Sequence, residues 1–355
     1  MTTATDNSNL LGFEPLLTPT AAKSRHPLST SAAQLVLQTR TDIQELLSGA
    51  DEDRLLLIVG PCSLHDQSAA YEYASKLLPL REALADVACV VMRTYFEKPR
   101  TTVGWKGMIN DPHLDGSCDV QAGLLRARET VLRINELGVP CASEALDPIT
   151  PQYIADLLSW ASIGARTTES QTHREMASGL SMPIGFKNGT DGSLNSAVNA
   201  LISAGHCHSF LGINAEGLTS VVKTRGNPDR HVVLRGGARP NYHMEDVEDA
   251  QALVTSAAPQ LRRAVMVDTS HGNSSKDYRR QARVCQDVVQ QFTAGQHAIM
   301  GLLIESNLKP GSQRWRGSPS GLEYGVSITD GCIGWTETEQ LLGWIGTQLR
   351  ARRAA

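Results

Sequence analysis

The sequence predicts an α/β fold: an eight-stranded parallel (β/α) TIM barrel with an N-terminal extension, an arm followed by a helix, and an inserted β-hairpin. Short apolar runs alternate with helical periods from Leu55 onward, as in βαβ units. Eight of the runs are typical of strands buried on both faces of a parallel sheet, and 355 residues suffice to close them into a barrel. A doubly wound open sheet is the alternative, because periodicity does not distinguish open from closed sheets.

The N-terminal extension precedes this alternation. The first 28 residues are polar, interrupted by prolines and without a clear period. The next segment is an amphipathic helix, with Ser29 or Thr30 as its cap and Gly49 at its end, and its apolar stripe is Leu35, Ile43, Leu46 and Leu47. We therefore divide the chain into an arm and helix over 1–50, used for oligomerisation or regulation, and a catalytic barrel over 51–355.

The eight barrel strands are expected within 55–60, 89–95, 139–145, 162–166, 183–187, 231–236, 264–270 and 298–306. Helical periods lie between most of them, within 68–84, 120–138, 193–205, 245–257 and 277–295. A ninth apolar run, 209–214, is followed by a turn and an alternating segment instead of a helix. We interpret it as the first arm of a hairpin inserted at about 208–226.

Composition excludes several classes of protein. The formal net charge is −4, so we expect no bulk attraction to nucleic acid and no membrane binding. The seven cysteines are scattered, without a CxxC pair, which argues against a disulfide framework. The N-terminus has neither the basic nor the apolar region of a signal peptide, and no apolar run reaches the ~18 residues of a spanning helix. We predict a cytoplasmic protein.

Ionisable or metal-ligating residues stand where the eight strands stop. In a parallel barrel these ends share one face, the face on which such enzymes place their chemistry. Charges often flank strands where the chain regains water, but that habit accounts for only some of the eight. We therefore expect a convergent site that includes Cys62, Arg93, Glu144, Arg166, Lys187, Arg235, His271 and Glu305.

One part of this site is cationic. So many positive charges at one end of the barrel are unfavourable unless anions bind among them. Arg and Lys side chains bind phosphate and carboxylate groups well. The ligands are therefore expected to carry several negative charges. The cations are Arg93, Lys98, Arg100, Arg166, Lys187 and Arg235, and the glycines after Arg235 let backbone amides approach an anion.

The other part is a candidate metal site. Cys62 has possible companions in His271, Glu305 and Asp330, and thiolate, imidazole and carboxylate together bind divalent transition metals. Two alternatives stay open for Cys62: an inert buried thiol and a nucleophile paired with a histidine. The metal interpretation gains weight because the first, seventh and eighth strands become neighbours when the barrel closes.

Several segments resemble those of class I 3-deoxy-D-arabino-heptulosonate 7-phosphate (DAHP) synthases. They include "GPCSLHD", "KPRTTVGWKG", "SEALDPITPQY", "LRGGARPNY", "DTSHGNSSKDYRRQ" and "YGVSITDGCIGW", and the resemblance spans nearly the whole chain. The "KPRTTVGWKG" block and the N-terminal extension separate this family from the related 3-deoxy-octulosonate 8-phosphate synthases. The sequence is most similar to the tyrosine-sensitive form.

The resemblance implies a metal-dependent, aldol-type condensation of phosphoenolpyruvate with D-erythrose 4-phosphate that releases phosphate and opens the shikimate pathway to aromatic amino acids. It implies one divalent metal ion per subunit (Mn, Fe, Co or Zn), held by Cys62, His271, Glu305 and Asp330. Lys98, His271 and a metal-bound water are the candidate proton carriers, and the sequence does not choose among them. A non-catalytic amino-acid-sensing or substrate-binding relative on the same barrel is the alternative function.

The resemblance also assigns substrate residues. Phosphoenolpyruvate would meet Arg93, Lys98, Arg166, Lys187, Arg235 and the backbone near Ala165, with Glu144 also counted among the binding residues. Erythrose 4-phosphate would meet Lys98, Pro99, Arg100 and Thr101.

Finally, the resemblance implies regulation and assembly. Relatives are homodimers or homotetramers and are inhibited by one aromatic amino acid; a glycine at 212 favours tyrosine over phenylalanine or tryptophan. The matching positions are Asn7, Pro151, Gly179, Leu180, Ser181, Phe210, Gly212 and Val222. Cys332 stands close in sequence to Asp330, and a Cys62–Cys332 disulfide that expels the metal on oxidation is a further hypothesis.

Overall fold

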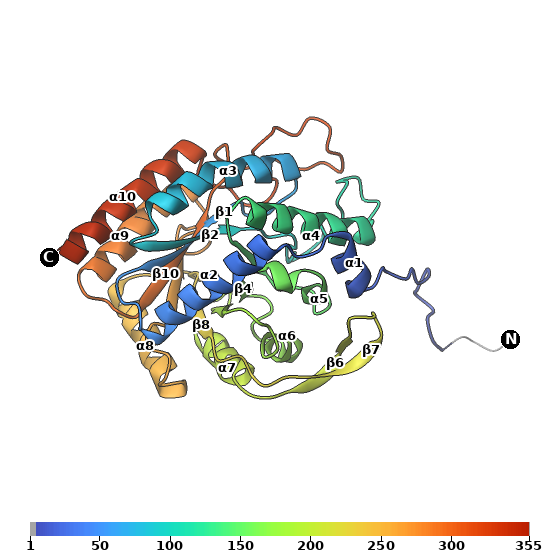
Figure 1. Cartoon of the computed structure of the whole chain (residues 1–355), viewed down its shortest axis with the longest axis horizontal. Coiled ribbons are helices and arrows are strands. Elements are labelled where there is room, and N and C mark those ends of the chain that lie inside the picture. Colours follow the sequence, from blue (N-terminus) through green and yellow to red (C-terminus); the bar gives the residue numbers. More distant parts are fainter. Residues whose placement is uncertain (1–4, 355) are drawn as a thin grey trace.

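A computed structural model, which describes residues 5–354, confirms the barrel. Its eight parallel strands close in the order β1-β10-β9-β8-β5-β4-β3-β2, which excludes the open sheet. Helices surround these strands (Figure 1). The strands are β1 (Leu55–Gly60), β2 (Ala88–Arg93), β3 (Cys141–Glu144), β4 (Trp160–Ile163), β5 (Ile184–Lys187), β8 (Arg230–Leu234), β9 (Val265–Asp268) and β10 (Ile299–Glu305). Every residue of these strands is buried, as the uninterrupted apolar runs predict.

The inserted hairpin is also confirmed. Strands β6 (Ser209–Ile213) and β7 (Thr219–Lys223) pair antiparallel, with Phe210 opposite Val222. The hairpin turn rests on the N-terminal extension, because the backbone and the hydroxyl of Thr20 both donate to the Ala215 carbonyl, at 2.9 and 2.8 Å. A tertiary contact thus holds the hairpin beside the extension.

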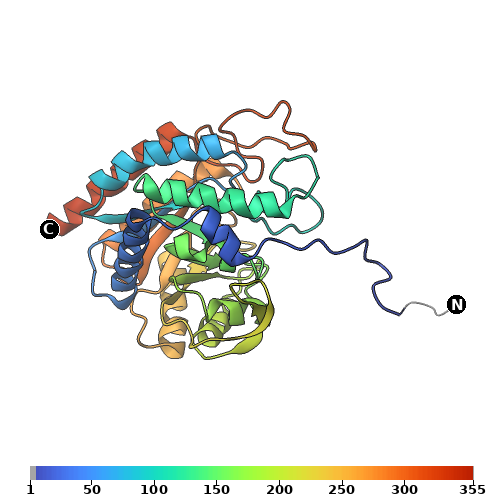
Figure 2. The same cartoon turned by 45° about the vertical axis from the view of Figure 1, so that its right-hand side comes forward.

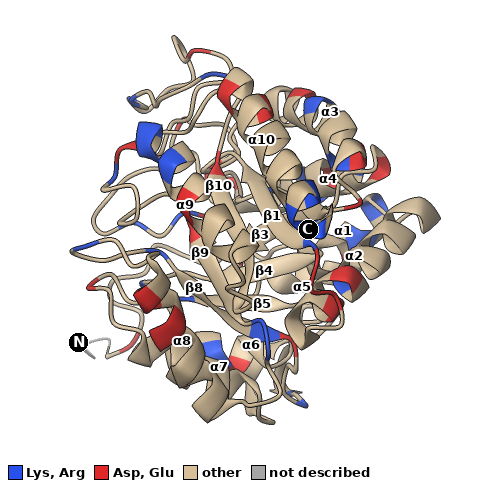
Figure 3. Cartoon of the chain, turned by 90° about the vertical axis from the view of Figure 1, so that its left-hand side faces the viewer, with Lys and Arg blue, Asp and Glu red and all other residues tan. Residues whose placement is uncertain are grey.

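Five helices that cover the barrel follow the predicted periods: α3 (Gln67–Ala83), α4 (Val120–Glu136), α7 (Asn195–Ala204), α8 (Met244–Ala257) and α9 (Gln281–Thr293). The C-terminal α10 (Trp335–Ala354) was not among those periods. Acidic and basic segments both appear on the side of the molecule drawn in Figure 3, where the start of α8 is acidic. No helix of the described residues is both long enough and apolar enough to span a bilayer.

Three short helices were not predicted: α1 (Pro19–Arg25), α5 (Pro151–Ile154) and α6 (Gln171–Ala177). Each has four to seven residues, too few for a period to show. A capping signal marks the first of them, since the Thr18 side chain accepts from the Ala21 amide and Pro19 occupies the first turn.

Helix α2 (Thr30–Ser48) forms where it was expected, with Ser29 as N-cap and Gly49 in the left-handed region (φ +74°). Its Ile43, Leu46 and Leu47 join one buried cluster with interior barrel residues such as Leu56 and Met300. The helix therefore closes the amino-terminal end of the barrel and shares its core. Val36, rather than Leu35, lies on its buried face.

The chain before α1 runs as an extended arm away from the barrel (Figure 2). Leu10, Leu11 and Phe13 on this arm are exposed. Residues 1–4 and 355, which belong to the two predicted domains, lie outside the described residues, and the role of the arm in assembly stays a prediction.

A histidine is buried inside the barrel below the strand ends. The Trp160 indole donates to His231 Nε2 at 2.9 Å, and the other ring nitrogen lies 3.1 Å from the Val232 carbonyl oxygen. Burial lowers the pKa of His231 to about 4, because the ring would have to take a charge away from water. The folded protein thus holds a neutral histidine at this position.

This burial predicts a loss of stability in mild acid. The unfolded histidine takes up a proton near its ordinary pKa of 6.5, whereas the folded one stays neutral until about 4, so the unfolded state binds more protons between these values. On going from about pH 7.5 to about pH 5, the free energy of unfolding should fall by about 2 kcal/mol more in the wild type than in His231→Gln. Urea unfolding at both pH values measures this, and equal pH dependence in the two proteins would contradict it.

Candidate active site at the carboxyl end of the barrel

One large cavity, of about 890 Å³, lies at the carboxyl ends of the strands. All the residues that the sequence proposes for substrate binding line it, and so do three of the four proposed metal ligands. The lining includes Arg93, Lys98, Pro99, Arg100, Thr101, Glu144, Ala165, Arg166, Lys187, Arg235, His271, Glu305 and Asp330. Residues far apart in the sequence therefore meet in one cleft, and their individual roles stay predictions.

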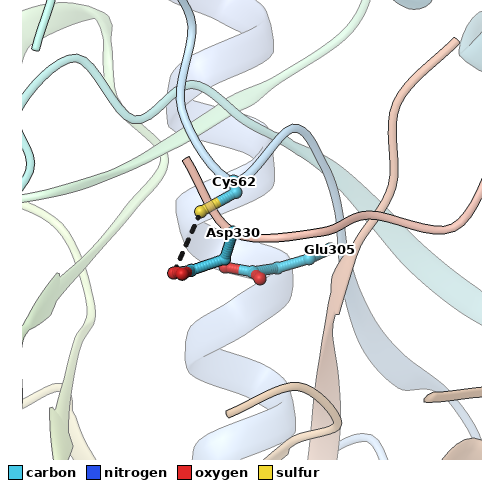
Figure 4. A group of neighbouring side chains, drawn as sticks. All are labelled: Cys62, Glu305 and Asp330. Carbon is cyan, nitrogen blue, oxygen red and sulfur yellow. Dashed lines mark hydrogen bonds between the residues drawn. The ribbon is translucent and has the colours of Figure 1, made fainter. Parts of the chain in front are cut away.

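The fourth proposed ligand, Cys62, is fully buried and lies beside two of the others (Figure 4). A sulfur of Cys62 and carboxylate oxygens of Glu305 and Asp330 all lie within 4.8 Å of one another. The pairing of β1 with β10 brings them together, since Gly60 stands opposite Glu305 in the register. One sulfur and two carboxylates at this spacing fit a divalent transition metal.

His271 is in the same cavity but outside this group of three. Its Nδ1 lies 2.9 Å from Asp268 Oδ2, although the two are not aligned as a hydrogen bond. Its backbone has φ +55°, a conformation that is uncommon for a residue with a side chain. A histidine whose Nδ1 faces a carboxylate can offer Nε2 to a metal, so His271 fits as a fourth ligand.

The surroundings of Cys62 argue against a nucleophilic Cys–His pair. Within residues 5–354, its sulfur accepts from Lys98 Nζ at 3.1 Å and donates to Asp330 Oδ2 at 3.5 Å. Burial, followed by the charge of Glu305, raises the pKa of Cys62 to about 12. Without a metal the sulfur is a neutral thiol, and a bound cation would be needed to make it a thiolate.

Lys98 stays charged despite its burial. Burial alone would lower the pKa of Lys98, but Cys62, Glu305 and Asp330 outweigh burial and raise it. The ammonium also donates to the Cys62 carbonyl at 3.3 Å. Lys98 therefore lies, as a charged hydrogen-bond donor, between the Cys62, Glu305 and Asp330 group and the cavity.

Two further cations are buried in ion pairs. Arg93 Nη2 donates to Glu305 Oε1 at 3.1 Å, and Lys187 Nζ donates to Asp268 Oδ2 at 2.8 Å. The second terminal nitrogen of Arg93, Nη1, is buried without a protein partner, although Arg93 lines the cavity. Because such a donor is costly to leave unmet, it favours an anionic ligand there.

Arg100, Arg166 and Arg235 extend the cationic lining. Within the described chain none of the three forms an ion pair with a carboxylate. Burial lowers the pKa of Arg235, and the nearby charge of Arg166 lowers it further. Like charges of this kind are stabilised when a phosphate or carboxylate lies between them.

The glycines after Arg235 are required by close packing. Gly236 has φ +74°, and a Cβ there would stand 2.5 Å from the Asn273 amide nitrogen. A Cβ on Gly237 would stand 2.4 Å from the Gly192 amide nitrogen. The glycines thus let the loop after β8 pack closely against the loops after β5 and β9, and together these loops form part of the cavity wall.

Sequence reasoning missed several residues of the site. Asp268 ends β9 and pairs with Lys187, Ser270 donates from its hydroxyl to Glu305 Oε2 at 2.8 Å, and Lys276 and Tyr278 line the cavity. The run "VMVD" carried the signal for Asp268, because its last residue is the charged one at the strand end. We had selected His271, three residues later, as the end of that strand.

Most of the proposed effector positions lie around the hairpin and a second, smaller cavity, whereas Asn7 lies apart from them on the arm. Phe210 and Val222 pair across the hairpin, and Ser178 next to Gly179 bonds Thr224 of the hairpin at 2.6 Å between hydroxyl oxygens. Pro151 and Leu180 line a cavity of about 10 Å³ that also reaches Glu144. Ser181 is exposed, and Asn7 lies on the arm with Asp6 as its side-chain partner.

Comparison with known proteins agrees with this architecture. Residues 33–343 match the DAHP synthetase I family. The Tyr-sensitive phospho-2-dehydro-3-deoxyheptonate aldolase of Escherichia coli (strain K12) is 51% identical over 99% of this chain and 98% of its own length. The Phe-sensitive enzyme of that strain is 50% identical (98% of each chain), and the Trp-sensitive one 49% identical (98% of this chain and 99% of its own). The aldolase structure from Francisella tularensis SCHU S4 superposes with a TM-score of 0.93 at 43% identity, covering 97% of this chain and 99% of that one.

The buried thiol predicts how this site responds to metals. Cys62→Ala removes the sulfur of the group, so the affinity for Co²⁺ should fall by about a hundredfold. Cys285→Ala, which removes a buried thiol on α9, is the matched control and should bind like the wild type. Calorimetric titration of metal-free protein with Co²⁺ measures both affinities, and the thiolate-to-cobalt absorption band should be absent from Cys62→Ala because that band needs the sulfur. Unchanged affinity in Cys62→Ala would rule out this group as the metal site.

Proposed function

The chain belongs to the DAHP synthetase I family, and from this membership we propose how its cavity binds two substrates, a metal and an effector. It condenses phosphoenolpyruvate with D-erythrose 4-phosphate, giving DAHP and phosphate, at the entry to the shikimate pathway, and it is subject to feedback by an aromatic amino acid. The observation that best supports the site assignment is the cavity itself, which gathers the cations and the carboxylates of the metal group in one place.

We assign phosphoenolpyruvate to the inner cations. Its phosphate and carboxylate would meet Arg93, Lys187, Arg166 and Arg235, and the free Nη1 of Arg93 supplies an unmet donor. Erythrose 4-phosphate would lie against Lys98 and the segment 99–101, farther along the same cavity wall. Two phosphates and a carboxylate account for the excess of positive charge.

The family is generally metal-dependent, and Cys62, Glu305 and Asp330 form a group that could hold an ion. We propose that His271 completes a four-ligand site for one divalent Mn, Fe, Co or Zn ion. When bound, the ion would act as a Lewis acid on the aldehyde oxygen of erythrose 4-phosphate. Lys98, charged and in contact with Cys62, is placed to hold or donate a proton beside that oxygen.

We further propose a cytoplasmic homodimer or homotetramer. All seven cysteines are free thiols, as in a reducing compartment, and the exposed Leu10, Leu11 and Phe13 of the arm offer apolar surface to another subunit. Light scattering at micromolar concentration should show an oligomer, and a monomer alone would contradict the proposal. A Cys62–Cys332 disulfide under oxidation also stays a prediction, to be sought by mass spectrometry of oxidised metal-free protein.

The catalytic assignment predicts a large defect in Lys98→Met. Removing the ammonium takes away a proton donor and a substrate contact, so kcat should fall by about a hundredfold or more. Lys106→Met, in the same loop but exposed, is the control and should retain activity. Phosphate release with both substrates and Mn²⁺ measures the rate, with each substrate omitted in turn. An active Lys98→Met would remove Lys98 from the mechanism, whereas an inactive wild type would favour the non-catalytic relative.

We propose tyrosine as the effector, bound between the hairpin, the end of α6 and the arm of a neighbouring subunit. Because Gly212 leaves room at the far end of an aromatic ring, a phenol fits there, and phenylalanine would leave its polar partner unmet, at a cost of about 1–3 kcal/mol. A Cβ at 212 would stand 2.8 Å from a Val222 methyl carbon, so any larger residue must displace that side chain.

This assignment predicts the order of inhibition. Tyrosine should inhibit the wild type most strongly, with tryptophan next, and Gly212→Ser should shift the preference toward phenylalanine. Gly212→Ala is the matched control, since it adds the Cβ without the hydroxyl. Rates measured with each amino acid in turn test the order, and strongest inhibition of the wild type by phenylalanine would reject tyrosine while leaving the catalytic assignment intact.

A further inference from the structure

Asp268 lies between the two halves of the site without facing the cavity. It ends β9, is 1% exposed and is not part of the cavity wall. Its Oδ1 accepts from the Ser270 amide at 3.0 Å, and its Oδ2 faces both Lys187 and His271. One buried carboxylate thus serves two residues to which the proposed function gives different tasks.

The contact with Lys187 fixes an anion-binding cation. Lys187 is 4% exposed, and Asp268 is its sole carboxylate partner within 4.0 Å in the described part of the chain. The 2.8 Å bond uses one of the three ammonium hydrogens and leaves two to point elsewhere. Burial and the like charge of Arg93 both lower the pKa of Lys187, and Asp268 offsets them, so the lysine stays charged.

The contact with His271 fixes a proposed metal ligand. With Nδ1 2.9 Å from the Asp268 carboxylate, the favoured neutral tautomer carries its proton on Nδ1 and leaves Nε2 free for a cation. The Asn273 side chain also donates, from Nδ2, to the Asp268 backbone carbonyl at 2.9 Å, which ties the His271 loop to the end of the strand. His271, whose backbone has a left-handed conformation, lies in this loop between Asp268 and Asn273.

We propose that Asp268 is a positioning residue that couples metal binding to phosphoenolpyruvate binding, by holding Lys187 and His271 on one carboxylate. This inference rests on the proposed function, because it assigns the anion to Lys187 and the metal to His271. The coupling is between two affinities. If a metal at His271 tightens phosphoenolpyruvate binding at Lys187 through Asp268, bound phosphoenolpyruvate tightens metal binding by the same factor.

The second buried ion pair does not duplicate this role. Glu305, which pairs with Arg93, belongs to the metal group itself, so removing it would delete a ligand. Asp268 touches neither substrate nor metal in our assignment, and its loss leaves all the proposed ligands and cations in the chain. Its effects are therefore separable from those of the binding residues.

The test is Asp268→Asn, which keeps the shape and removes the charge. Two affinities are measured on the full-length protein: Co²⁺ on metal-free protein without phosphoenolpyruvate, by absorption, and phosphoenolpyruvate on metal-free protein in EDTA, by calorimetry. The phosphoenolpyruvate titration is then repeated on the Co²⁺-loaded protein. We expect Co²⁺ affinity to fall about ten- to a hundredfold and phosphoenolpyruvate affinity about tenfold. The factor by which Co²⁺ tightens phosphoenolpyruvate binding should also shrink toward one.

Asp277→Asn is the matched control. It also removes a carboxylate from the segment that follows β9, but the Asp277 carboxylate pairs with Arg279 and not with Lys187 or His271. Both of its affinities should stay within about twofold of the wild type. If Asp268→Asn fails to fold, Lys187→Met/Asp268→Asn removes both buried charges, and its Co²⁺ affinity still tests the His271 contact.

An Asp268 variant that keeps either affinity within about twofold of the wild type would overturn the coupling. Condensation by the wild type is assayed separately. A wild type that binds Co²⁺ and phosphoenolpyruvate but makes no DAHP would reject the proposed reaction and leave the two titrations interpretable.

Discussion

The site depends on one electrostatic constraint, the neutralisation of cations that the barrel buries. Arg93, Lys98 and Lys187 are each less than a tenth exposed, and three like charges so close together would oppose folding. Each has a carboxylate near it that offsets its charge: Glu305 for Arg93, Asp268 for Lys187, and Glu305 with Asp330 for Lys98. Two of these carboxylates, Glu305 and Asp330, also belong to the candidate metal group, so the cations of the cavity and that group lie against each other.

The geometry of the barrel brings these cations and carboxylates together. Parallel strands bring all their carboxyl ends to one rim, and closure makes β1 and β10 neighbours, so that Cys62 and Glu305 meet although most of the chain separates them. Below the charged layer lies a cluster of apolar residues such as Leu56 and Met300, with the neutral His231 bonded to Trp160 of that cluster, and α2 seals the far end. Charges at the rim thus have a dry layer behind them and water on one side only, which strengthens their interaction with a bound anion.

Sequence patterns predicted the parts of this design that depend on local periodicity. The eight buried runs, the hairpin and the capped α2 each carry a signal within a few residues, as Ser29 and Gly49 illustrate. The short helices escaped because one turn has no period. Asp268 was not predicted as a site residue because its two contacts, with Lys187 on β5 and His271 in the loop after β9, form only in the folded chain. Likewise, no spacing rule could show that Cys62, Glu305 and Asp330 cluster more closely than His271 does, since that depends on where the closed barrel and its loops place each side chain.

Overall sequence identity does not indicate which aromatic amino acid is the effector. The three relatives with different sensitivities are 51%, 50% and 49% identical to this chain, so global identity carries almost no information about which amino acid binds. The proposal therefore assigns the choice among phenol, phenyl and indole to a few positions around the hairpin. Gly212 is one of them, because any side chain there would have to displace Val222. The small cavity lined by Pro151 and Leu180 also includes Glu144, which lines the main cavity, so the two cavities share this one side chain.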